Sequence, residues 1–219
     1  MKISDEQIQL LKLYRKAPLG EKVKIYARIL FNFNQIKKYL DRFTPDSGCV
    51  FDYGCGYGIF ANYMKLKNPN LHIIGFDISK KRIEIAKESA KITGVKFQND
   101  FKLDELKNLK LVLFVDVLLF IPTHEKAQLF ELFYDKLENS GIIFIKDTLK
   151  SNSIRFRYTS VEEKIKLKFG VYGENVKAHL HYAGKEEFVE MLTKTGFELI
   201  EIAEENHLIY PGIFIIAQK

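Results

Sequence analysis

The sequence contains little cysteine and no long apolar run, and both features limit what the chain can be. Its two cysteines, Cys49 and Cys55, lie six residues apart, a spacing that predicts neither a disulfide framework nor a zinc site. The longest apolar run, residues 111–122, is far shorter than a bilayer span and contains Asp116. The first residues are charged throughout, unlike a secretory signal. We therefore expect a reduced, cytoplasmic protein without a metal centre.

The sequence also lacks internal repeats, low-complexity tracts and Pro/Gly-rich linkers, so its 219 residues favour a single globular domain. The net charge of +6 is unevenly placed. Residues 1–48 hold ten Lys/Arg against five Asp/Glu, and residues 150–182 hold seven against three. These two basic segments are rich in aromatic residues. They favour an anionic or amphiphilic partner over a neutral one, although solvated helix faces explain the charge equally well.

The apolar pattern predicts two N-terminal helices followed by alternating strands and helices. The first helices are expected at residues 4–16 and 21–42, separated by residues 17–20; the second carries an apolar stripe that includes Val23 and Ala27. Beyond residue 48, apolar segments alternate with helical ones. The predicted strands are 49–53, 71–76, 95–98, 111–115 and 141–146, and the predicted helices are 59–67, 79–93 and 123–139. This alternation is typical of a parallel sheet buried on both faces.

The last third of the chain breaks this rhythm. Residues 154–169 are expected to form a helix within an insertion, residues 150–182, and another helix follows at 185–195. Strands at 197–203 and 213–217 are separated by a short link, which predicts antiparallel pairing. The expected α/β fold is a Rossmann-like, seven-stranded, mostly parallel sheet with an antiparallel last strand. We assign residues 1–48 to a helical cap, 49–149 to a cofactor-binding core, 150–182 to the insertion and 183–219 to a closing helix and hairpin. The cap and the insertion are together expected to form a lid over the cofactor.

A glycine loop carries the strongest functional signal. Gly54, Gly56 and Gly58 follow a predicted strand and precede a helix, where they allow a tight turn and close approach of the backbone to a ligand. Asp77 lies 19 residues beyond Gly58, at the end of the next strand, where a carboxylate can accept hydrogen bonds from ribose hydroxyls. Asp100 follows the third strand and can accept from an adenine amino group. Open α/β sheets bind ligands at these strand ends.

With Asp52 preceding the glycines, this arrangement resembles the class I S-adenosylmethionine-dependent methyltransferases. Their acidic-x-Gly-x-Gly-x-Gly motif is matched from Asp52 to Gly58, and their acidic residues after the second and third strands by Asp77 and Asp100. The resemblance implies S-adenosylmethionine as cofactor and a role for Asp52 in positioning its methionine amino group. The expected cofactor contacts are Asp52, Tyr53, Gly54, Cys55, Gly56, Gly58, Asp77, Ile78, Asn99, Asp100, Phe101, Val115 and Asp116.

Candidates for acceptor chemistry are weaker. They lie after predicted strand ends or in the insertion: Asp116, Lys146, Asp147 and His181 as catalytic candidates, and Tyr14, Arg28, Arg155 and Tyr210 for acceptor binding. A histidine on a loop is more often a surface or hydrogen-bonding residue than a base. Methyl transfer depends mainly on placing the acceptor in line with an already activated methyl group, so a general base is needed only where a proton must leave early.

Motifs that would name the acceptor are missing. No Asn-Pro-Pro-Tyr or Asp-Pro-Pro-Tyr follows the fourth strand, and no Pro-Cys dipeptide is present, which weakens base methylation as a function. We expect a small anionic or amphiphilic acceptor. The sequence leaves open an RNA methyltransferase using the basic surface, a non-catalytic S-adenosylmethionine-binding protein and contact with an anionic membrane surface.

Overall fold

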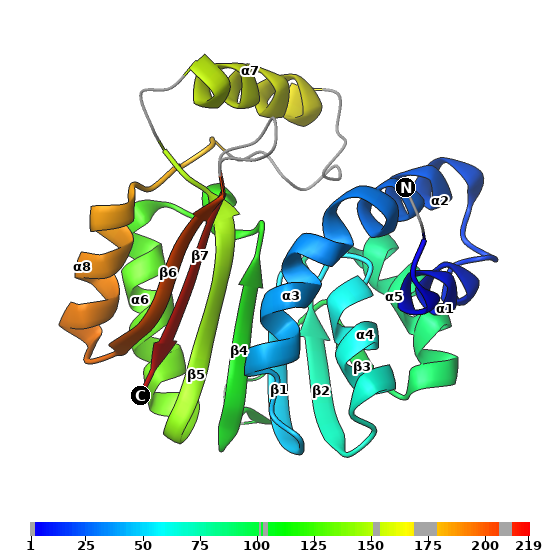
Figure 1. Ribbon diagram of the computed structural model, residues 1–219, viewed down its shortest axis with the longest axis horizontal. Helices are drawn as coiled ribbons and strands as arrows, with labels where there is room; N and C mark the ends of the chain where they lie inside the picture. The colour runs from blue at the N-terminus through cyan, green and yellow to red at the C-terminus, as the bar shows by residue number, and fades with distance from the viewer. Residues whose placement is uncertain (1–2, 101, 103–104, 151–153, 169–178, 206–211) are drawn as a thin grey trace. The chain divides into compact units, whose positions relative to one another are not determined.

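The computed structural model describes residues 3–100, 102, 105–150, 154–168, 179–205 and 212–219 (Figure 1). Seven strands form one sheet in the order β3-β2-β1-β4-β5-β7-β6, and β7 runs antiparallel to both of its neighbours. The predicted α/β class and the antiparallel last strand are thereby confirmed. The chain divides into two compact units, Met1–Glu105 and Leu106–Lys219.

The first unit contains the N-terminal helices and the three strands that precede residue 100. Its elements are α1 (Asp5–Leu13), α2 (Leu19–Ala27), the π-helical turn η1 (Arg28–Asn32), α3 (Phe33–Phe43), β1 (Gly48–Tyr53), α4 (Ile59–Lys67), β2 (Leu71–Phe76), α5 (Lys80–Thr93) and β3 (Lys96–Gln98). β2 pairs in parallel with both β1 and β3. The carboxyl ends of these strands therefore lie at one edge, where the predicted cofactor residues follow them.

Local sequence signals explain several helix ends in this unit. Ser4 caps α1, and its hydroxyl and the Gln7 side chain exchange hydrogen bonds with each other's backbone amides. The Ser79 hydroxyl accepts the Arg82 amide at the start of α5. Gly94 ends α5 in the left-handed conformation that favours glycine at this position.

The second N-terminal helix begins earlier than predicted and buries a different face. Leu19 and Gly20 form its first turn, after Pro18, instead of separating it from α1. Ile25 and Ile29 are buried, whereas Val23 is 62% exposed and Ala27 is also exposed. The predicted stripe was wrong at Val23 and Ala27, because a helix with apolar residues on two sides does not reveal from sequence which side meets the core.

The second unit contains the remaining four strands. Its elements are β4 (Leu109–Val115), the 3-10 turn η3 (Leu118–Phe120), α6 (Thr123–Lys136), β5 (Leu137–Thr148), α7 (Ile154–Lys168), α8 (Lys185–Thr195), β6 (Glu198–Glu205) and β7 (Gly212–Gln218). β4 and β5 pair in parallel, so their carboxyl ends also share an edge. β4 and β7 are buried along most of their length, and β5 is buried along half of it.

The end of α6 differs from the prediction. The helix ends at Lys136, and β5 begins directly at Leu137, although the pattern predicts helix to residue 139. Leu137 is 3% exposed and pairs with Leu109 in β4, ahead of a register shift. Burial of the Leu137 side chain and its pairing in the sheet outweigh the helical pattern of the local sequence.

Candidate functional site

The glycine loop has the backbone shape that its sequence predicts. Gly54, Gly56 and Gly58 all have positive φ, at 75°, 56° and 74°. The amides of Gly54 and Cys55 donate to the carbonyl of Phe76 at 2.7 and 2.8 Å, which fastens the loop to the end of β2. A Cβ at Gly58 would lie 2.2 Å from Cζ of Phe97, whereas a Cβ at Gly56 would meet only Asp77, at 4.0 Å. The loop is therefore closely packed at Gly58 and open at Gly56.

Asp77 lies against this loop, as the spacing predicts. Its side chain is buried, and its Oδ2 accepts the Gly56 amide at 2.9 Å. Its Oδ1 accepts the Ser79 amide at 2.8 Å. Each carboxylate oxygen has further lone pairs, so both can still accept hydroxyl donors from a ligand.

Asp52 is the most unusual group in the first unit. It is 2% exposed, and among the described residues its Oδ2 has no hydrogen-bond partner. Burial raises the pKa of Asp52, the guanidinium of Arg28 lowers it and the charge of Asp77 raises it, and the net result is a pKa of about 7. A buried carboxylate oxygen without a partner is costly, and a cationic ligand group would satisfy it. The site therefore fits a ligand with an amino group.

The N-terminal helices hold the glycine loop through Tyr57. The Tyr14 hydroxyl of α1 donates to the Tyr57 carbonyl at 2.9 Å, and the Tyr57 hydroxyl donates to the Glu21 carboxylate of α2. Arg82 lies over the Tyr57 ring, 5.5 Å from its centroid. Sequence reasoning missed Tyr57 and Glu21. The available signal was that Tyr57 is the variable residue inside the Gly-x-Gly motif.

The other predicted cofactor residues of this unit surround the loop. Tyr53 and Cys55 are half-buried beside the glycines, and Ile78 is 53% exposed directly after Asp77. Asn99 and Asp100 form a bend after β3, with Asp100 exposed. Phe101 lies outside the described residues. The structure thus places this predicted set at the carboxyl ends of β1, β2 and β3, and their contacts to a cofactor remain predictions.

In the second unit, Asp116 and Lys146 are brought together after β4 and on β5. Their side chains form an ion pair, and the Asp116 amide donates to the Lys146 carbonyl at 2.8 Å. Asp116 has a φ of 55°, which is uncommon for a residue other than glycine. Such conformations concentrate at functional sites because the surrounding structure must stabilise them. Val115, the residue before it, is buried at the end of β4.

Asp147 faces inward and holds a turn. It is 1% exposed, and its carboxylate accepts the Leu119 amide at 2.9 Å and the Thr148 amide at 2.6 Å. Burial raises the pKa of Asp147 to about 7, and the charge of Asp116 also raises it. Both of these hydrogen bonds come from backbone amides. The role that fits Asp147 best is therefore to hold the turn η3 in place.

His181 is fastened to the same turn by its backbone. Its amide donates to the Leu119 carbonyl at 2.7 Å, and its own carbonyl accepts the ammonium of Lys126. Lys126 is completely buried on α6, and burial lowers its pKa. Sequence reasoning missed Lys126, but the i, i+4, i+7 spacing with Phe130 and Phe133 could have placed it on the buried face.

Of the four predicted acceptor-binding residues, the structure describes the side chains of Tyr14 and Arg28. Tyr14 is buried with its hydroxyl on the glycine loop, and Arg28 lies over the Phe60 ring, 5.4 Å from its centroid. The Arg155 backbone is part of α7, and its side chain is outside the described residues, as is all of Tyr210. Acceptor binding by these four residues remains a prediction.

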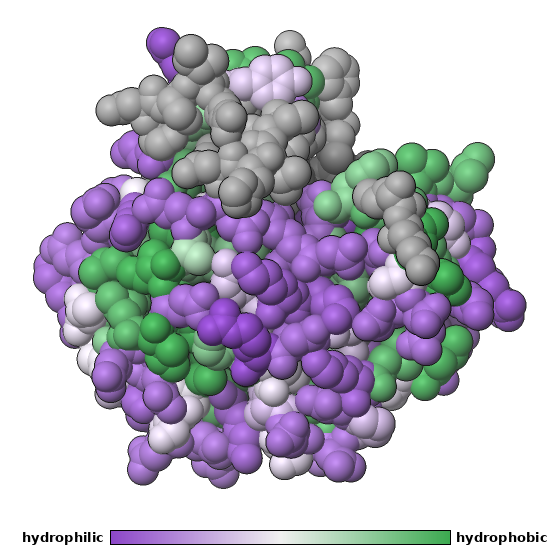
Figure 2. Space-filling model, in the orientation of Figure 1, coloured by the Kyte–Doolittle hydropathy of each residue, from purple (hydrophilic) through white to green (hydrophobic). Residues whose placement is uncertain are grey.

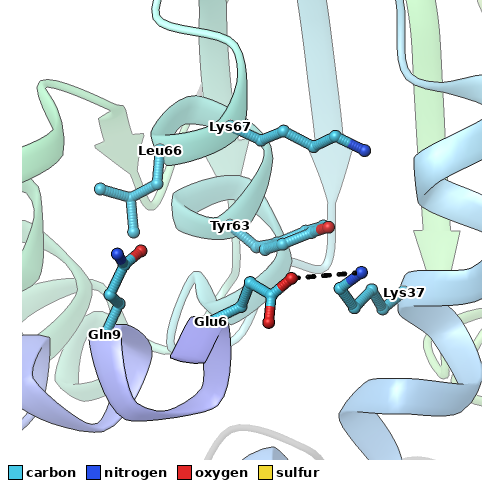
Figure 3. Close-up of a pocket in the computed structure, with 6 residues that line it drawn as sticks. All are labelled: Glu6, Gln9, Lys37, Tyr63, Leu66 and Lys67. Atoms are coloured by element: carbon cyan, nitrogen blue, oxygen red, sulfur yellow. Dashed lines mark ion pairs between the residues drawn. The ribbon is translucent and has the colours of Figure 1, made fainter. Parts of the chain in front are cut away.

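A pocket of about 210 Å³ lies elsewhere in the first unit, on the carboxyl-terminal half of α4 (Figure 3). Figure 3 shows the Glu6–Lys37 ion pair across it, at 3.5 Å. Lys37 and Lys67 also bind Asp41, at 2.6 Å each. Burial raises the pKa of Asp41, but hydrogen bonds from these lysines outweigh burial and lower this pKa to about 2. The charges of this pocket thus satisfy one another, and the glycine loop is at the other end of α4.

Comparisons with known proteins agree with the geometry. A family model described as a methyltransferase domain matches residues 26–202, so the chain belongs to that family. Its solved structural neighbours include S-adenosylmethionine-dependent methyltransferases of class I, and S-adenosylmethionine is the cofactor of this family. The chain is therefore an S-adenosylmethionine-dependent methyltransferase.

Individual relatives and solved structures are similar to this chain over most of its length. A carboxy-S-adenosyl-L-methionine synthase from Nautilia profundicola is 28% identical over 183 residues, which cover 78% of each chain. A methyltransferase structure from Methanosarcina mazei has a TM-score of 0.63 at 18% identity, covering 83% of this chain and 96% of that one. Magnesium protoporphyrin IX methyltransferase from Synechocystis, with bound S-adenosylhomocysteine, has a TM-score of 0.63 at 15% identity, covering 98% and 93%. These structural likenesses show the fold.

The described part of the chain contains neither a candidate membrane span nor a candidate metal cluster. None of its helices combines the length and apolar character needed to cross a membrane. In the same residues, no three His, Cys, Asp or Glu side chains gather as a metal site would require.

Proposed function

We propose that the chain transfers the methyl group of S-adenosylmethionine to a small anionic or amphiphilic acceptor. The observation that carries the cofactor half of this proposal is the buried Asp52 oxygen without a partner, on the strand that leads into the glycine loop. When bound, the cofactor supplies a methyl group already activated by its sulfonium. The chain therefore needs to bind, orient and exclude water more than to activate a nucleophile.

Three of the predicted cofactor contacts, together with Tyr57, have a stated chemical role in this proposal. Asp52 receives the amino group of the methionine part, which compensates the buried negative charge. Asp77 receives the ribose hydroxyls while its bonds to Gly56 and Ser79 keep it in place. Asp100 receives the adenine amino group. Tyr57, held by Tyr14 and Glu21, keeps the loop in the shape that these contacts need.

For acceptor binding and catalysis, we propose roles for the Asp116–Lys146 ion pair and for His181. Lys146 is 14% exposed and supplies a positive charge that Asp116 orients. His181 is half-buried, and its backbone is tied to η3 through Leu119. Its imidazole is our candidate for accepting a proton from an acceptor hydroxyl or amine.

The distribution of charge along the chain supports an anionic acceptor. Residues 1–48 and 150–182 carry net charges of +5 and +4, while the whole chain has a net charge of +6, and Arg157 is exposed on α7. We predict that Arg157→Glu raises the KM for an anionic acceptor several-fold while the Kd for S-adenosylmethionine stays unchanged. Lys87→Glu, an equally exposed reversal on α5, is the matched control. Equal effects of both reversals would reject a local cationic acceptor site.

The experiment is a screen with S-adenosylmethionine labelled in its methyl group. Small carboxylates, phosphates and lipid-like acids serve as acceptors, and bulk RNA serves as the comparison. Label transferred to a small acid, with little dependence on salt, supports the proposal. Label in RNA that decreases steeply as salt rises would replace it with the RNA methyltransferase alternative. Tight cofactor binding without transfer to any acceptor would favour a non-catalytic protein.

The curated relatives favour a second candidate, formation of carboxy-S-adenosylmethionine. One such synthase matches 78% of this chain, and a second, from Campylobacter lari, matches 84% at 22% identity. Mass spectrometry of the nucleoside recovered after incubation with carboxylate donors separates the two candidates. Recovery of S-adenosylhomocysteine indicates methyl transfer, and recovery of a carboxylated S-adenosylmethionine indicates the synthase reaction.

A further inference from the structure

The helix α2 and the turn η1 that continues it present an exposed apolar face. Leu19 is 77% exposed, Val23 62% and Phe31 68%, and Ala27 between them is also exposed. We call these four residues the α2 stripe. Exposed large apolar side chains are common singly, but a continuous row of them indicates a surface that something covers.

The spacing explains why these residues form one row. They recur every fourth residue; α2 turns about 100° per residue, so its three members lie about 40° apart, and Phe31 follows one turn later in η1. Glu21, Ile25 and Ile29 project from the opposite side and are buried against the rest of the first unit. Folding of this unit thus uses one face of α2 and leaves the other to water.

The charges that α2 places beside its own stripe are positive. Lys24 is exposed about 80° from the centre of the stripe by the same rotation, and Lys22, which is half-buried, lies about 120° from it on the other side. Glu21 is the single acidic residue of α2; it is 8% exposed and binds Tyr57 and Lys81 on the inner side, and the ammonium of Lys24 also lies 3.4 Å from its carboxylate. The outward charge of this helix is therefore entirely cationic. Figure 2 shows an apolar patch over α2, with hydrophilic side chains beside it.

A second helix repeats the pattern. In α7, Tyr158, Val161 and Ile165 are 59%, 57% and 49% exposed at i, i+3 and i+7 spacing. The basic residues Arg157 and Lys164 are exposed next to them. Two separate basic segments thus combine exposed apolar residues with positive charge, and each has the composition of a helix that lies on a lipid surface.

We propose that the α2 stripe docks on an anionic membrane surface, with its apolar side chains among the acyl chains and Lys22 and Lys24 at the headgroups. The charge distribution favours lipid over a second copy of this chain. Protein interfaces are depleted in lysine, and a stable dimer buries roughly 800 Å² on each partner, far more than four side chains provide. Anionic headgroups complement lysines on both sides of the stripe. This inference does not depend on the identity of the acceptor.

The test is flotation of the full chain with vesicles of phosphatidylcholine, with and without phosphatidylserine. We expect binding to the anionic vesicles only, and a loss of roughly 10-fold or more in the triple variant Leu19→Ser, Val23→Ser and Phe31→Ser. Replacing Lys22 and Lys24 by Gln should weaken binding about 5-fold for each charge. The matched control is Ile92→Ser, which removes a 69% exposed side chain from α5 and should change nothing.

Three results would overturn the proposal. One is equal flotation of the wild type and the triple variant, and another is binding that does not require the anionic lipid. The third is self-association of the wild type without vesicles that the triple variant abolishes, which would assign the stripe to a second copy. Unchanged circular dichroism and S-adenosylmethionine affinity of the triple variant show that its fold is intact, since all three side chains face water.

Discussion

The Asp77 carboxylate accepts the Gly56 amide at 2.9 Å, so the end of β2 directly shapes the glycine loop after β1. The same side chain accepts the Ser79 amide at the start of α5. One residue thereby fixes the relative positions of the loop and the next strand–helix connection. A ligand that hydrogen-bonds to Asp77 would contact a group that the fold already holds in place, which reduces the entropic cost of binding.

Asp52 predicts a pH dependence of stability and of cofactor binding. Its folded pKa of about 7 lies above the ordinary value of 3.8. Between these values the folded chain keeps a proton that the unfolded chain has released, so the free energy of unfolding decreases as pH rises. Replacement by asparagine should remove up to about 4 kcal/mol of this penalty above pH 7. Thermal unfolding of the wild type and Asp52→Asn at pH 5 and pH 8 measures the difference.

The same substitution separates stability from binding. S-adenosylmethionine should bind the wild type more tightly as pH rises towards about 7, because the ionised Asp52 attracts its amino group. In Asp52→Asn the affinity should be weaker and should vary less with pH. A variant that binds the cofactor with wild-type affinity at every pH would contradict the role assigned to Asp52.

Gly58 and Gly20 predict opposite effects of the same change. Alanine at Gly58 requires a left-handed backbone and places its Cβ 2.2 Å from the buried Phe97 ring. We expect Gly58→Ala to lose roughly 2–4 kcal/mol of stability and most cofactor affinity. At Gly20, on α2, no atom lies within 4 Å of the new Cβ, and alanine should stabilise the helix by up to about 1 kcal/mol. Chemical denaturation measures both, and equal effects would mean that loop packing is unimportant.

From the contacts of Tyr57 we predict that the N-terminal helices control the conformation of the glycine loop. The Tyr57 hydroxyl donates to Glu21. Burial raises the pKa of Glu21, but hydrogen bonds from Lys81 and Tyr57 outweigh burial and lower this pKa to about 2. Tyr57→Phe removes the bond and should weaken S-adenosylmethionine binding about 3- to 10-fold with little loss of stability. Tyr26→Phe is the control, because its hydroxyl donates to Leu11 within the helical segment and not to the loop. If both variants lose the same affinity, the effect is general weakening of the cap.

The cofactor side could be predicted from sequence because its signals are local. The Asp52–Gly58 motif and Asp77 follow strands whose apolar pattern is unambiguous, and strand ends of a parallel sheet share an edge. The helix 59–67 and the strand 71–76 were predicted with the bounds that the structure has. Glycine positions in the loop were correct because the turn requires positive φ there.

The rest could not be predicted because it depends on contacts between distant residues. Glu21 accepts a hydrogen bond from Tyr57, which is 36 residues away in the sequence. Lys126 donates to the carbonyl of His181, which is 55 residues away. No local pattern reports such partners. Val23 and Ala27 were assigned to a buried stripe for the same reason, since the choice of the buried face of α2 is made by packing against other elements.

The most direct test of the account is a calorimetric titration with S-adenosylmethionine and S-adenosylhomocysteine, comparing wild type, Asp77→Asn and Asp77→Ala. The account predicts micromolar binding of both ligands by the wild type. Affinity should fall roughly 10- to 100-fold in Asp77→Ala and less in Asp77→Asn, which keeps one acceptor oxygen. Unfolding curves without ligand show whether the loop itself survives each change. Wild-type protein that binds neither ligand, but binds NAD or FAD, would contradict the account.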